Sequence, residues 1–300
     1  MERIKLADTF DVSRIALGFW RLKTWNLSAR TLLKNVERWV DEGITTFDHA
    51  DIYGDYSCER LFGEVLKQQP ALRYKMQLVS KCGILLPSEK FPGRRINYYD
   101  TGYAHIMRSV EHSLKNLHTD YLDLLLIHRP DPLMDPAETA RAFEELHRSG
   151  KVLHFGVSNF TPPDTEMLQA HLSLPLVTNQ VELSPLQLEH FENGNMAWFR
   201  KTGMHPMAWS PFGGGKLFHP DDEKSLNVYR VLMEVAQRRD TLNVAAVALA
   251  WLLKHPAGII PILGTGKPQR VEKSKEAFAI ELTSEEWFEI YVAGRGSRMP

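Results

Sequence analysis

The sequence predicts an α/β protein, a (β/α)₈ TIM barrel with two extra helices. Eight short apolar runs alternate with amphipathic stretches along the 300 residues, and this alternation is typical of a parallel sheet covered by helices. Eight β-α units over roughly 250 residues are the usual content of such a barrel. A doubly wound open sheet is the second possibility, but no GxGxxG motif follows the first apolar run.

The eight apolar runs are the predicted strands. They are short and rich in residues that favour extended structure. In chain order they cover residues 13–18, 45–50, 76–81, 121–128, 153–159, 176–184, 205–211 and 258–264.

Amphipathic stretches follow the predicted strands, and several carry helix start or stop signals. Asp135 precedes Pro136 as an N-cap precedes a proline in the first turn, and Gly43 and Gly150 stand where C-caps belong. The predicted barrel helices cover residues 28–42, 57–69, 100–118, 136–149, 162–171, 187–203, 242–254 and 267–278. The two extra helices cover 222–239 and 284–293, and Thr283 begins a capping sequence for the second.

Composition gives no sign of a domain boundary or of a charged partner. No linker or low-complexity tract interrupts the chain, so we expect one domain, residues 1–300. The formal net charge of −1 gives no reason to expect nucleic acid, and no apolar run is long enough for a membrane span. Cys58 and Cys82 are the only cysteines, which fits a reducing cytoplasm rather than a disulfide framework.

Polar residues stand at the ends of three neighbouring predicted strands. Asp48, Lys81 and His128 end the second, third and fourth strands, and Tyr53 follows the second in a turn marked by Gly54. In a TIM barrel the carboxyl ends of the strands form the active-site face. Each residue alone also has a structural interpretation, as a cap, a solvated charge or a loop histidine. Their coincidence at one face favours catalysis.

These residue types suit proton transfer to an oxygen. A free tyrosine has a pKa near ~10, and we expect Lys81 to lower the pKa of Tyr53 toward a useful range. Asp48 would keep the buried lysine charged, and His128 would place a substrate oxygen. No nucleophile accompanies them, so hydride from a cofactor is the natural partner reaction.

Several segments resemble the aldo-keto reductase superfamily. DHADIYG (48–54) is similar to its D-T-A-x-x-Y-G segment, and YLDLLLIHRP (121–130) to its fourth-strand segment. FGVSNF (155–160), NQVELSP (179–185) and AWSP (208–211) follow in the family's order. The resemblance runs from about residue 13 to the last helix. It is greatest for the bacterial YdhF-type oxidoreductases, on RPDPLMD (129–135) and MAWSPFGGG (207–215). His49 departs from the threonine common in the family.

The resemblance implies a catalytic tetrad and a nicotinamide site. The tetrad would be Asp48, Tyr53, Lys81 and His128, with Tyr53 as proton donor. Further residues would contact the cofactor. The carboxamide of the nicotinamide would be bound by Ser158, Asn159 and Gln180, and its ring face by Trp209.

Two glycine-containing loops follow the seventh and eighth predicted strands, where TIM barrels often bind phosphate. Their backbones can approach an anion closely, although a flexible turn is the common alternative. The loops are Ser210-Pro211-Phe212-Gly213-Gly214-Gly215 and Gly264-Thr265-Gly266-Lys267. Lys267 and Arg270 suit the 2′-phosphate of NADPH, which we therefore expect in preference to NADH; a solvated helix face is the alternative.

The end of the first strand and one long loop complete the expected site. We expect Gly18, Phe19 and Trp20 among the cofactor contacts, and Trp20 also as a wall of the pocket. Residues 82–103 form a long connection that could overhang the barrel mouth. We expect small aldehydes or ketones as substrates.

Two other functions are weighed against the reductase. A metal-dependent barrel hydrolase could use His49, Asp51 and His128, but later strands add no ligand histidine and Lys81 would repel the ion. A nucleotide-binding redox sensor or regulatory subunit could keep the same barrel, as some potassium-channel β subunits of this superfamily do. No metal is expected in the reductase.

Overall fold

The computed structural model describes residues 1–299 of the chain. Its main sheet is a closed barrel of eight strands in the order β10-β11-β12-β3-β4-β5-β8-β9. The predicted (β/α)₈ barrel is therefore confirmed. The strands are β3 (Ala16–Gly18), β4 (Thr46–Asp48), β5 (Gln77–Cys82), β8 (Leu122–Ile127), β9 (Val152–Ser158), β10 (Leu176–Glu182), β11 (Met207–Trp209) and β12 (Ile260–Leu263).

The chain divides into two compact units. The first contains Met1–Gln180 with Gly264–Gly266, and the second contains Val181–Leu263 with Lys267–Pro300. Each unit is described by itself.

In the first unit, parallel pairing sets the level of the polar strand ends. Gly18 pairs with Asp48, Asp48 with Val79, and Lys81 with Leu126. Asp48 therefore ends β4 level with Val79, two residues before Lys81 on β5, and the side chains of Asp48 and Lys81 are both buried. The predicted first strand, 13–18, is too long at its start.

Ser13 belongs instead to a hairpin that the sequence analysis missed. β1 (Arg3–Ala7) and β2 (Phe10–Ser13) pair antiparallel. The Ser13 hydroxyl donates to the Ile15 carbonyl at 2.7 Å, and the Ser13 amide donates to the Thr46 hydroxyl at 3.0 Å. These side-chain bonds replace the strand ladder, so the barrel strand begins only at Ala16.

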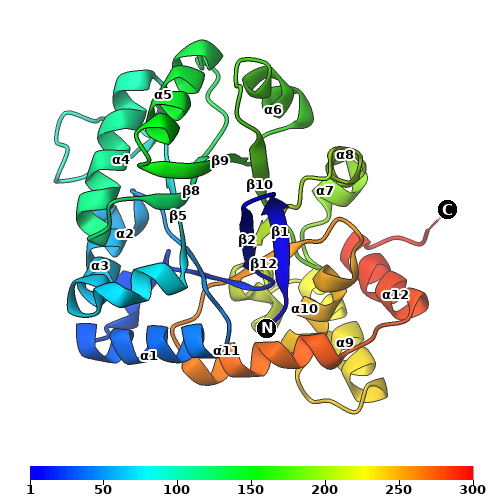
Figure 1. The fold of residues 1–300 in the computed structure, drawn as a ribbon. Helices are drawn as coiled ribbons and strands as arrows, with labels where there is room; N and C mark the ends of the chain where they lie inside the picture. Colours follow the sequence, from blue (N-terminus) through cyan, green and yellow to red (C-terminus); the bar gives the residue numbers. More distant parts are fainter. Residues whose placement is uncertain (300) are drawn as a thin grey trace. The chain divides into compact units, whose positions relative to one another are not determined.

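Five helices of the first unit pack beside its strands (Figure 1). Asp135 caps one of them by accepting from the Ala137 amide, as predicted, and Gly43 and Gly150 follow two helix ends with φ of 84° and 71°. The helices are α1 (Ala29–Asp41), α3 (Cys58–Gln68), α4 (Tyr103–Leu117), α5 (Pro136–Arg148) and α6 (Pro162–Gln169). Short elements lie between them: η1 (Leu22–Trp25), α2 (Tyr53–Tyr56), η2 (Pro70–Lys75), β6 (Ile84–Leu85) and β7 (Tyr98–Tyr99).

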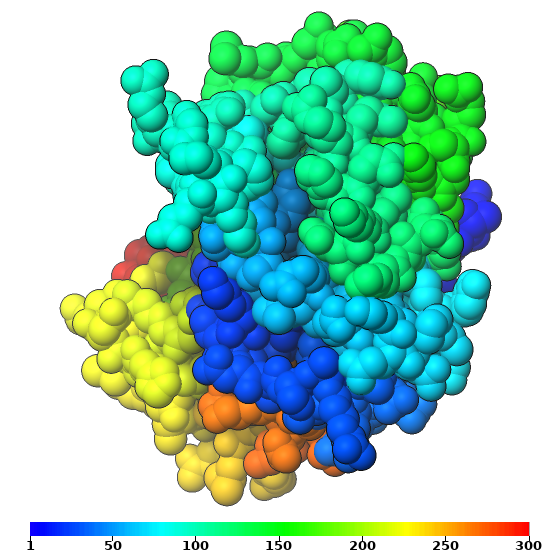
Figure 2. All heavy atoms as spheres, turned by 90° about the vertical axis from the view of Figure 1, so that its left-hand side faces the viewer, coloured from blue at the N-terminus to red at the C-terminus, as the bar shows by residue number. Residues whose placement is uncertain are grey.

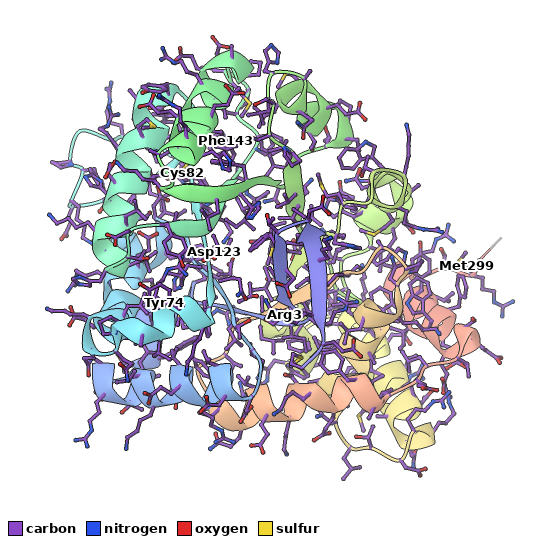
Figure 3. All side chains as sticks on the ribbon, in the orientation of Figure 1. Arg3, Tyr74, Cys82, Asp123, Phe143 and Met299 are labelled. Atoms are coloured by element: carbon purple, nitrogen blue, oxygen red, sulfur yellow. The ribbon has the colours of Figure 1, made fainter. Side chains whose placement is uncertain are left out.

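Helix–strand contacts in this unit are apolar and close. Phe143 of α5, labelled in Figure 3, stacks on Phe155 of β9 with ring centroids 4.2 Å apart. At Gly63 of α3 a Cβ would lie 1.9 Å from the Asn116 carbonyl oxygen, so glycine is required where α3 meets α4. This packing holds the strand ends, and hence the polar residues on them, in fixed positions.

The second unit carries β11 and β12, which pair parallel through Met207 with Ile260. The predicted helix 187–203 is two helices, because Gly194 between them has a φ of 89°. Thr283 forms the predicted capping box with Glu286. The helical elements are α7 (Glu189–Glu192), α8 (Asn195–Thr202), η3 (Gly213–Phe218), α9 (Glu223–Arg238), α10 (Val244–Lys254), α11 (Pro268–Ser274), η4 (Lys275–Ala279) and α12 (Ser284–Arg295). None of the helices within residues 1–299 has both the length and the apolar character that crossing a membrane requires.

Candidate active site

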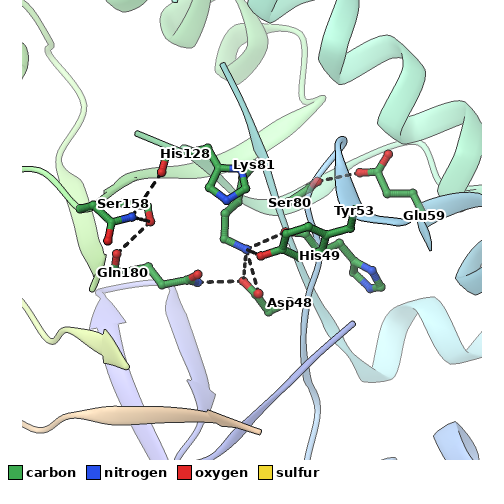
Figure 4. Close-up of polar contacts among 10 residues, drawn as sticks. Asp48, His49, Tyr53, Glu59, Ser80, Lys81, His128, Ser158 and Gln180 are labelled. Atoms are coloured by element: carbon green, nitrogen blue, oxygen red, sulfur yellow. Dashed lines mark hydrogen bonds and ion pairs between the residues drawn. The ribbon is translucent and has the colours of Figure 1, made fainter. Parts of the chain in front are cut away.

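The Lys81 ammonium is the centre of a buried polar cluster in the first unit (Figure 4). Its Nζ lies 2.8 Å from each carboxylate oxygen of Asp48. It also lies 2.8 Å from the His49 carbonyl oxygen and 3.1 Å from the Tyr53 hydroxyl oxygen. Lys81 itself is completely buried.

This geometry gives the ammonium more acceptors than it has hydrogens. A lysine ammonium carries three N–H donors, whereas four oxygen atoms surround Lys81 Nζ. The Tyr53 oxygen is the most distant of the four. Because the ammonium can only donate, the phenolic hydrogen of Tyr53 cannot point at it. The hydroxyl hydrogen of Tyr53 is therefore available to an acceptor on another side of the phenolic oxygen.

The charges of the cluster hold Lys81 positive, and burial holds Tyr53 protonated. Burial lowers the pKa of Lys81, but the charge and hydrogen bonds of Asp48 and Tyr53 outweigh it, and the pKa lies above its usual value. Burial raises the pKa of Tyr53, although the charge of Lys81 opposes that effect. The expected net lowering of the Tyr53 pKa is therefore wrong in direction, because desolvation of the phenolate exceeds the attraction of Lys81.

His128 lies beside Tyr53 at the end of β8. The two rings are nearly perpendicular, at 76°, with centroids 5.8 Å apart. Burial, together with the charges of Lys81 and Arg129, lowers the pKa of His128 well below its usual value, so the imidazole is neutral. Its buried Nδ1 has no hydrogen-bond partner among the described residues. A neutral imidazole has one N–H, which can donate a hydrogen bond to a carbonyl oxygen.

Ser158, Asn159 and Gln180 form a polar chain that joins this cluster. The Ser158 hydroxyl donates to the Gln180 carbonyl at 2.8 Å, and Asn159 Nδ2 donates to the Ser158 hydroxyl at 2.8 Å. Gln180 Nε2 donates to Asp48 Oδ1 at 2.8 Å. The resemblance to the family implies a nicotinamide contact for Gln180 and does not predict this bond to Asp48.

His49 and Asp51 do not form a metal site. The His49 ring is buried between Phe19, which it stacks on at 4.8 Å, and Phe62, which it meets edge-on at 4.5 Å. The Asp51 carboxylate accepts from Ser109 at 2.7 Å. Within residues 1–299, no group of three or more His, Cys, Asp and Glu side chains could hold a metal ion. The metal-dependent hydrolase therefore lacks a ligand set.

Glu59 and Ser80 form a further polar contact next to Lys81, and the sequence-based expectations give this contact no role. Glu59 of α3 accepts from the Ser80 hydroxyl at 2.6 Å, and Ser80 directly precedes Lys81. Burial raises the pKa of Glu59, and burial raises the pKa of Asp51 to about 7. One sequence signal was present: Glu59 has helical spacing with the buried Phe62 and Leu66, so it occupies an apolar helix face.

The first strand end contributes one exposed and two buried residues. Gly18 and Phe19 are buried, whereas 58% of Trp20 is exposed. The backbone of Phe19 is also occupied, because its amide donates to the Asp48 carbonyl at 2.9 Å and its carbonyl accepts from the Leu22 amide at 3.0 Å. The exposed indole of Trp20 remains suited to line a pocket.

In the second unit, the loop after β11 has a backbone suited to an anion. Gly213, Gly214 and Gly215 have φ of 57°, 67° and 107°, and Ser210 also has a positive φ of 50°. A Cβ added at Gly214 or Gly215 would meet nothing within 4 Å, so the backbone faces open space there. Trp209, Pro211 and Phe212 belong to the same stretch, and the Phe212 ring packs on Phe218 at 5.1 Å.

The loop after β12 is partly open and partly packed. At Gly264 a Cβ would meet nothing within 4 Å, whereas at Gly266 it would lie 2.5 Å from the Trp25 ring. Packing against Trp25 is therefore a sufficient reason for glycine at position 266. Lys267 and Arg270 are exposed, and Lys267 directly precedes α11 with Thr265 two residues before it.

Comparison with known proteins identifies the family. A model of the Aldo/keto reductase family matches residues 14–293. Oxidoreductase YdhF of Escherichia coli is 47% identical over 290 residues, which cover 97% of this chain and 96% of that protein. A 6-dehydroglucose reductase of Agrobacterium fabrum is 43% identical over 303 residues, with 100% of both chains covered. A solved glycerol dehydrogenase from Gluconobacter oxydans superimposes with a TM-score of 0.84 at 26% identity, over 99% of this chain and 97% of that chain.

The expected resemblance to the YdhF-type oxidoreductases is confirmed by these matches. The match covers the barrel from β3 to α12 and includes every strand that carries a residue of the polar cluster. The chain belongs to the aldo/keto reductase family.

Proposed function

We propose that this chain is an NADPH-dependent reductase that converts aldehyde or ketone carbonyls to alcohols, with Tyr53 as the general acid. Membership of the family already makes it an oxidoreductase of small carbonyl compounds. The observation that carries the finer proposal is the Lys81 ammonium, which lies 2.8 Å from both Asp48 oxygens and 3.1 Å from the Tyr53 hydroxyl.

The four polar residues divide the work of proton transfer. Tyr53 gives its phenolic proton to the carbonyl oxygen as that oxygen gains charge. Lys81 stabilises the phenolate that remains, and Asp48 keeps Lys81 charged and fixes its position. The neutral imidazole of His128 holds the substrate oxygen by a hydrogen bond near Tyr53. Burial raises the pKa of Tyr53, which keeps the proton on the donor until a substrate accepts it.

The residues present fit a dinucleotide. Ser158, Asn159 and Gln180 offer hydroxyl and amide groups to a nicotinamide carboxamide, and Trp209 offers a ring face. The open backbone at Gly214, Gly215 and Gly264 suits phosphate groups. When bound, the cofactor supplies the hydride that the carbonyl carbon receives. Contacts are also proposed for Gly18, Phe19, Trp20, Ser210, Pro211, Phe212, Gly213, Thr265, Gly266, Lys267 and Arg270.

Residues 1–300 are proposed to act as one functional domain, because a closed barrel needs all eight of its strands. A cytoplasmic location is supported by the two free, buried cysteines, Cys58 and Cys82. The net charge of −1 supports a small-molecule substrate rather than a nucleic acid or a membrane surface.

The test is a panel of aldehydes and ketones followed through NADPH absorbance, with Tyr53→Phe as the key variant. The panel includes a sugar aldehyde, because one relative is named a 6-dehydroglucose reductase. We expect wild-type turnover of several members and a loss of about 10²–10⁴-fold in Tyr53→Phe, with NADPH affinity almost unchanged. The exposed Tyr74→Phe is the control. Wild-type turnover in Tyr53→Phe would refute the acid assignment, and very slow turnover with tightly retained NADPH would favour the redox sensor.

Cofactor preference is tested separately. Replacement of Lys267 and Arg270 by alanine should weaken NADPH binding by about tenfold or more and leave NADH binding nearly constant, since only NADPH has the 2′-phosphate. Lys273→Ala on the same helix is the control. Equal losses for both dinucleotides would show that these two side chains do not read the 2′-phosphate.

A further inference from the structure

Tyr53 is followed by three successive residues in the left-handed conformation. Gly54, Asp55 and Tyr56 have φ of 59°, 57° and 56°. Glycine adopts this region freely, and at Gly54 a Cβ would also lie 2.5 Å from Cys58 Sγ. Asp55 and Tyr56 carry a Cβ, for which the region is unfavourable. Two such residues in succession persist only where their surroundings hold them.

The loop between β6 and β7 supplies those surroundings through its cations. Lys90 Nζ donates to the Asp55 carbonyl oxygen, lies 3.5 Å from the Tyr56 carbonyl oxygen and pairs with the Asp55 carboxylate at 3.7 Å. Arg94 Nη1 donates to the Tyr56 hydroxyl at 2.8 Å, and the Leu86 amide donates to the same oxygen at 2.9 Å. Both the backbone and the side chain of the turn are thus held from one loop.

Ring contacts brace the same loop against the turn. The Phe91 ring meets Tyr56 edge-on at 4.8 Å, and the Arg94 guanidinium lies 3.8 Å from the centre of the Phe91 ring. The loop is closed at its base, where Leu85 pairs with Tyr98, and it is tightened by the bridge between Ser88 and Phe91. In Figure 2 this part of the chain, cyan in the bar, projects at the upper left edge of the view.

The contacts of Lys90 exist only while the turn stays left-handed. Carbonyl oxygens change direction when φ changes sign, so a right-handed Asp55 would turn its oxygen away from Lys90. The turn is joined directly to Tyr53, whose carbonyl accepts from the Ser57 amide at 3.0 Å. A shift of the turn therefore moves the Tyr53 hydroxyl relative to Lys81, to which it lies at 3.1 Å.

We propose that Lys90 and Arg94 are positioning residues for Tyr53: they hold the left-handed turn that aims its hydroxyl at the carbonyl site. This inference rests on the proposed function, in which Tyr53 is the proton donor.

The first experiment compares Arg94→Ala with Arg95→Ala. The two arginines are neighbours on one loop. Arg95 is exposed, whereas Arg94 is partly buried and donates to the Tyr56 hydroxyl. In Arg94→Ala we expect kcat to fall about tenfold, less than the hundredfold that a ~1 Å misplacement can cause, with NADPH affinity unchanged within about twofold. Arg95→Ala should keep wild-type kcat. Tyr56→Phe, which loses only the hydroxyl, should reproduce part of the Arg94→Ala loss in a fold that circular dichroism shows to be intact.

The second experiment separates alignment of Tyr53 from simple substrate contact. In a Tyr53→Phe background, single-turnover rates should show no further loss from Arg94→Ala, because the residue acts through the phenol. Lys90→Ala should lower kcat, and adding Asp55→Gly should recover most of it, because glycine accepts the left-handed conformation without help.

Three results would overturn the inference: an Arg94→Ala effect on KM alone, an equal loss in the Tyr53→Phe background, or no recovery by Asp55→Gly. Full turnover in Tyr53→Phe alone would instead refute the proposed function.

Discussion

The first unit contains two buried cations that are paired with aspartates, and they are built in different ways. Arg73 of η2 lies just before β5 and pairs with Asp123 at 2.7 Å. Nε donates to the Thr119 hydroxyl at 2.8 Å and Nη1 donates to the Met76 carbonyl, while Nη2, which pairs with Asp123, also donates to the Tyr121 carbonyl. Asp123 in turn accepts from the Leu78 amide at 2.8 Å. Each nitrogen of the planar guanidinium thus has at least one acceptor.

Lys81 lies at the other end of β5, and several residues next to it in the sequence or in space have buried polar atoms that lack partners. Both ring nitrogens of His49, Nδ1 of His128 and Oδ1 of Asp51 are buried without a hydrogen-bond partner among the described residues. Buried polar groups are normally bonded, and an exception calls for an explanation. The Arg73 pair completes its hydrogen bonds within the protein, as a structural pair does. The Lys81 pair also completes its hydrogen bonds, but the His128 Nδ1 and the Tyr53 hydroxyl hydrogen beside it keep capacity for a ligand, as a reaction site must.

The largest effect that this comparison predicts is on stability. Arg73→Ala leaves Asp123 buried without its cation, and breaking a buried pair in this way costs about 3–5 kcal/mol. Urea unfolding should show that loss, while kcat per folded molecule stays near wild type at low temperature. Lys81→Ala is the matched variant and should abolish turnover. If Arg73→Ala removed turnover and left unfolding unchanged, the assignment of the two pairs would be reversed.

Periodicity predicted the barrel because each barrel strand is an apolar run with helical sequence on both sides. Periodicity does not show where a local contact decides the structure. The Ser13 hydroxyl ends one strand and separates it from Ala16, and Gly194 divides one helical stretch into two. Neither event changes the hydrophobic pattern. The loop between β6 and β7 was expected only as a long connection, because its folding depends on Tyr56, which lies in another segment.

The candidate site was predictable in its members and not in its contacts. Asp48, Lys81 and His128 end strands, and strand ends of a barrel meet at one face. The bond from Gln180 to Asp48 joins residues 132 positions apart, and only the closed sheet brings them together. The direction of the Tyr53 pKa shift was wrong for a related reason: burial, its largest cause, follows from packing and not from residue type.

A smaller effect on the free energy of unfolding is expected at His49, and this effect should depend on pH. The His49 carbonyl holds Lys81, but its side chain behaves as an aromatic ring between Phe19 and Phe62. Burial and the charge of Lys81 lower the pKa of this imidazole from 6.5 to about 3. Between these two pKa values, the unfolded chain therefore binds a proton at His49 that the folded chain does not bind. The contribution of His49 to the free energy of unfolding is therefore fully present above pH 6.5 and is lost as the pH falls toward 3.

His49→Phe keeps the ring and the carbonyl and removes the titration. At pH 8 the variant should be as stable as wild type or slightly more stable, because two unpartnered nitrogens disappear. At pH 5 wild type has lost ~2 kcal/mol through this group and the variant has not, so urea unfolding should show the gap widening by that amount. The exposed His112→Phe should show no such widening. A gap that is equal at both pH values would mean that folded His49 accepts a proton, and turnover lost at pH 8 would mean that the ring nitrogens, and not only the carbonyl, serve the Lys81 site.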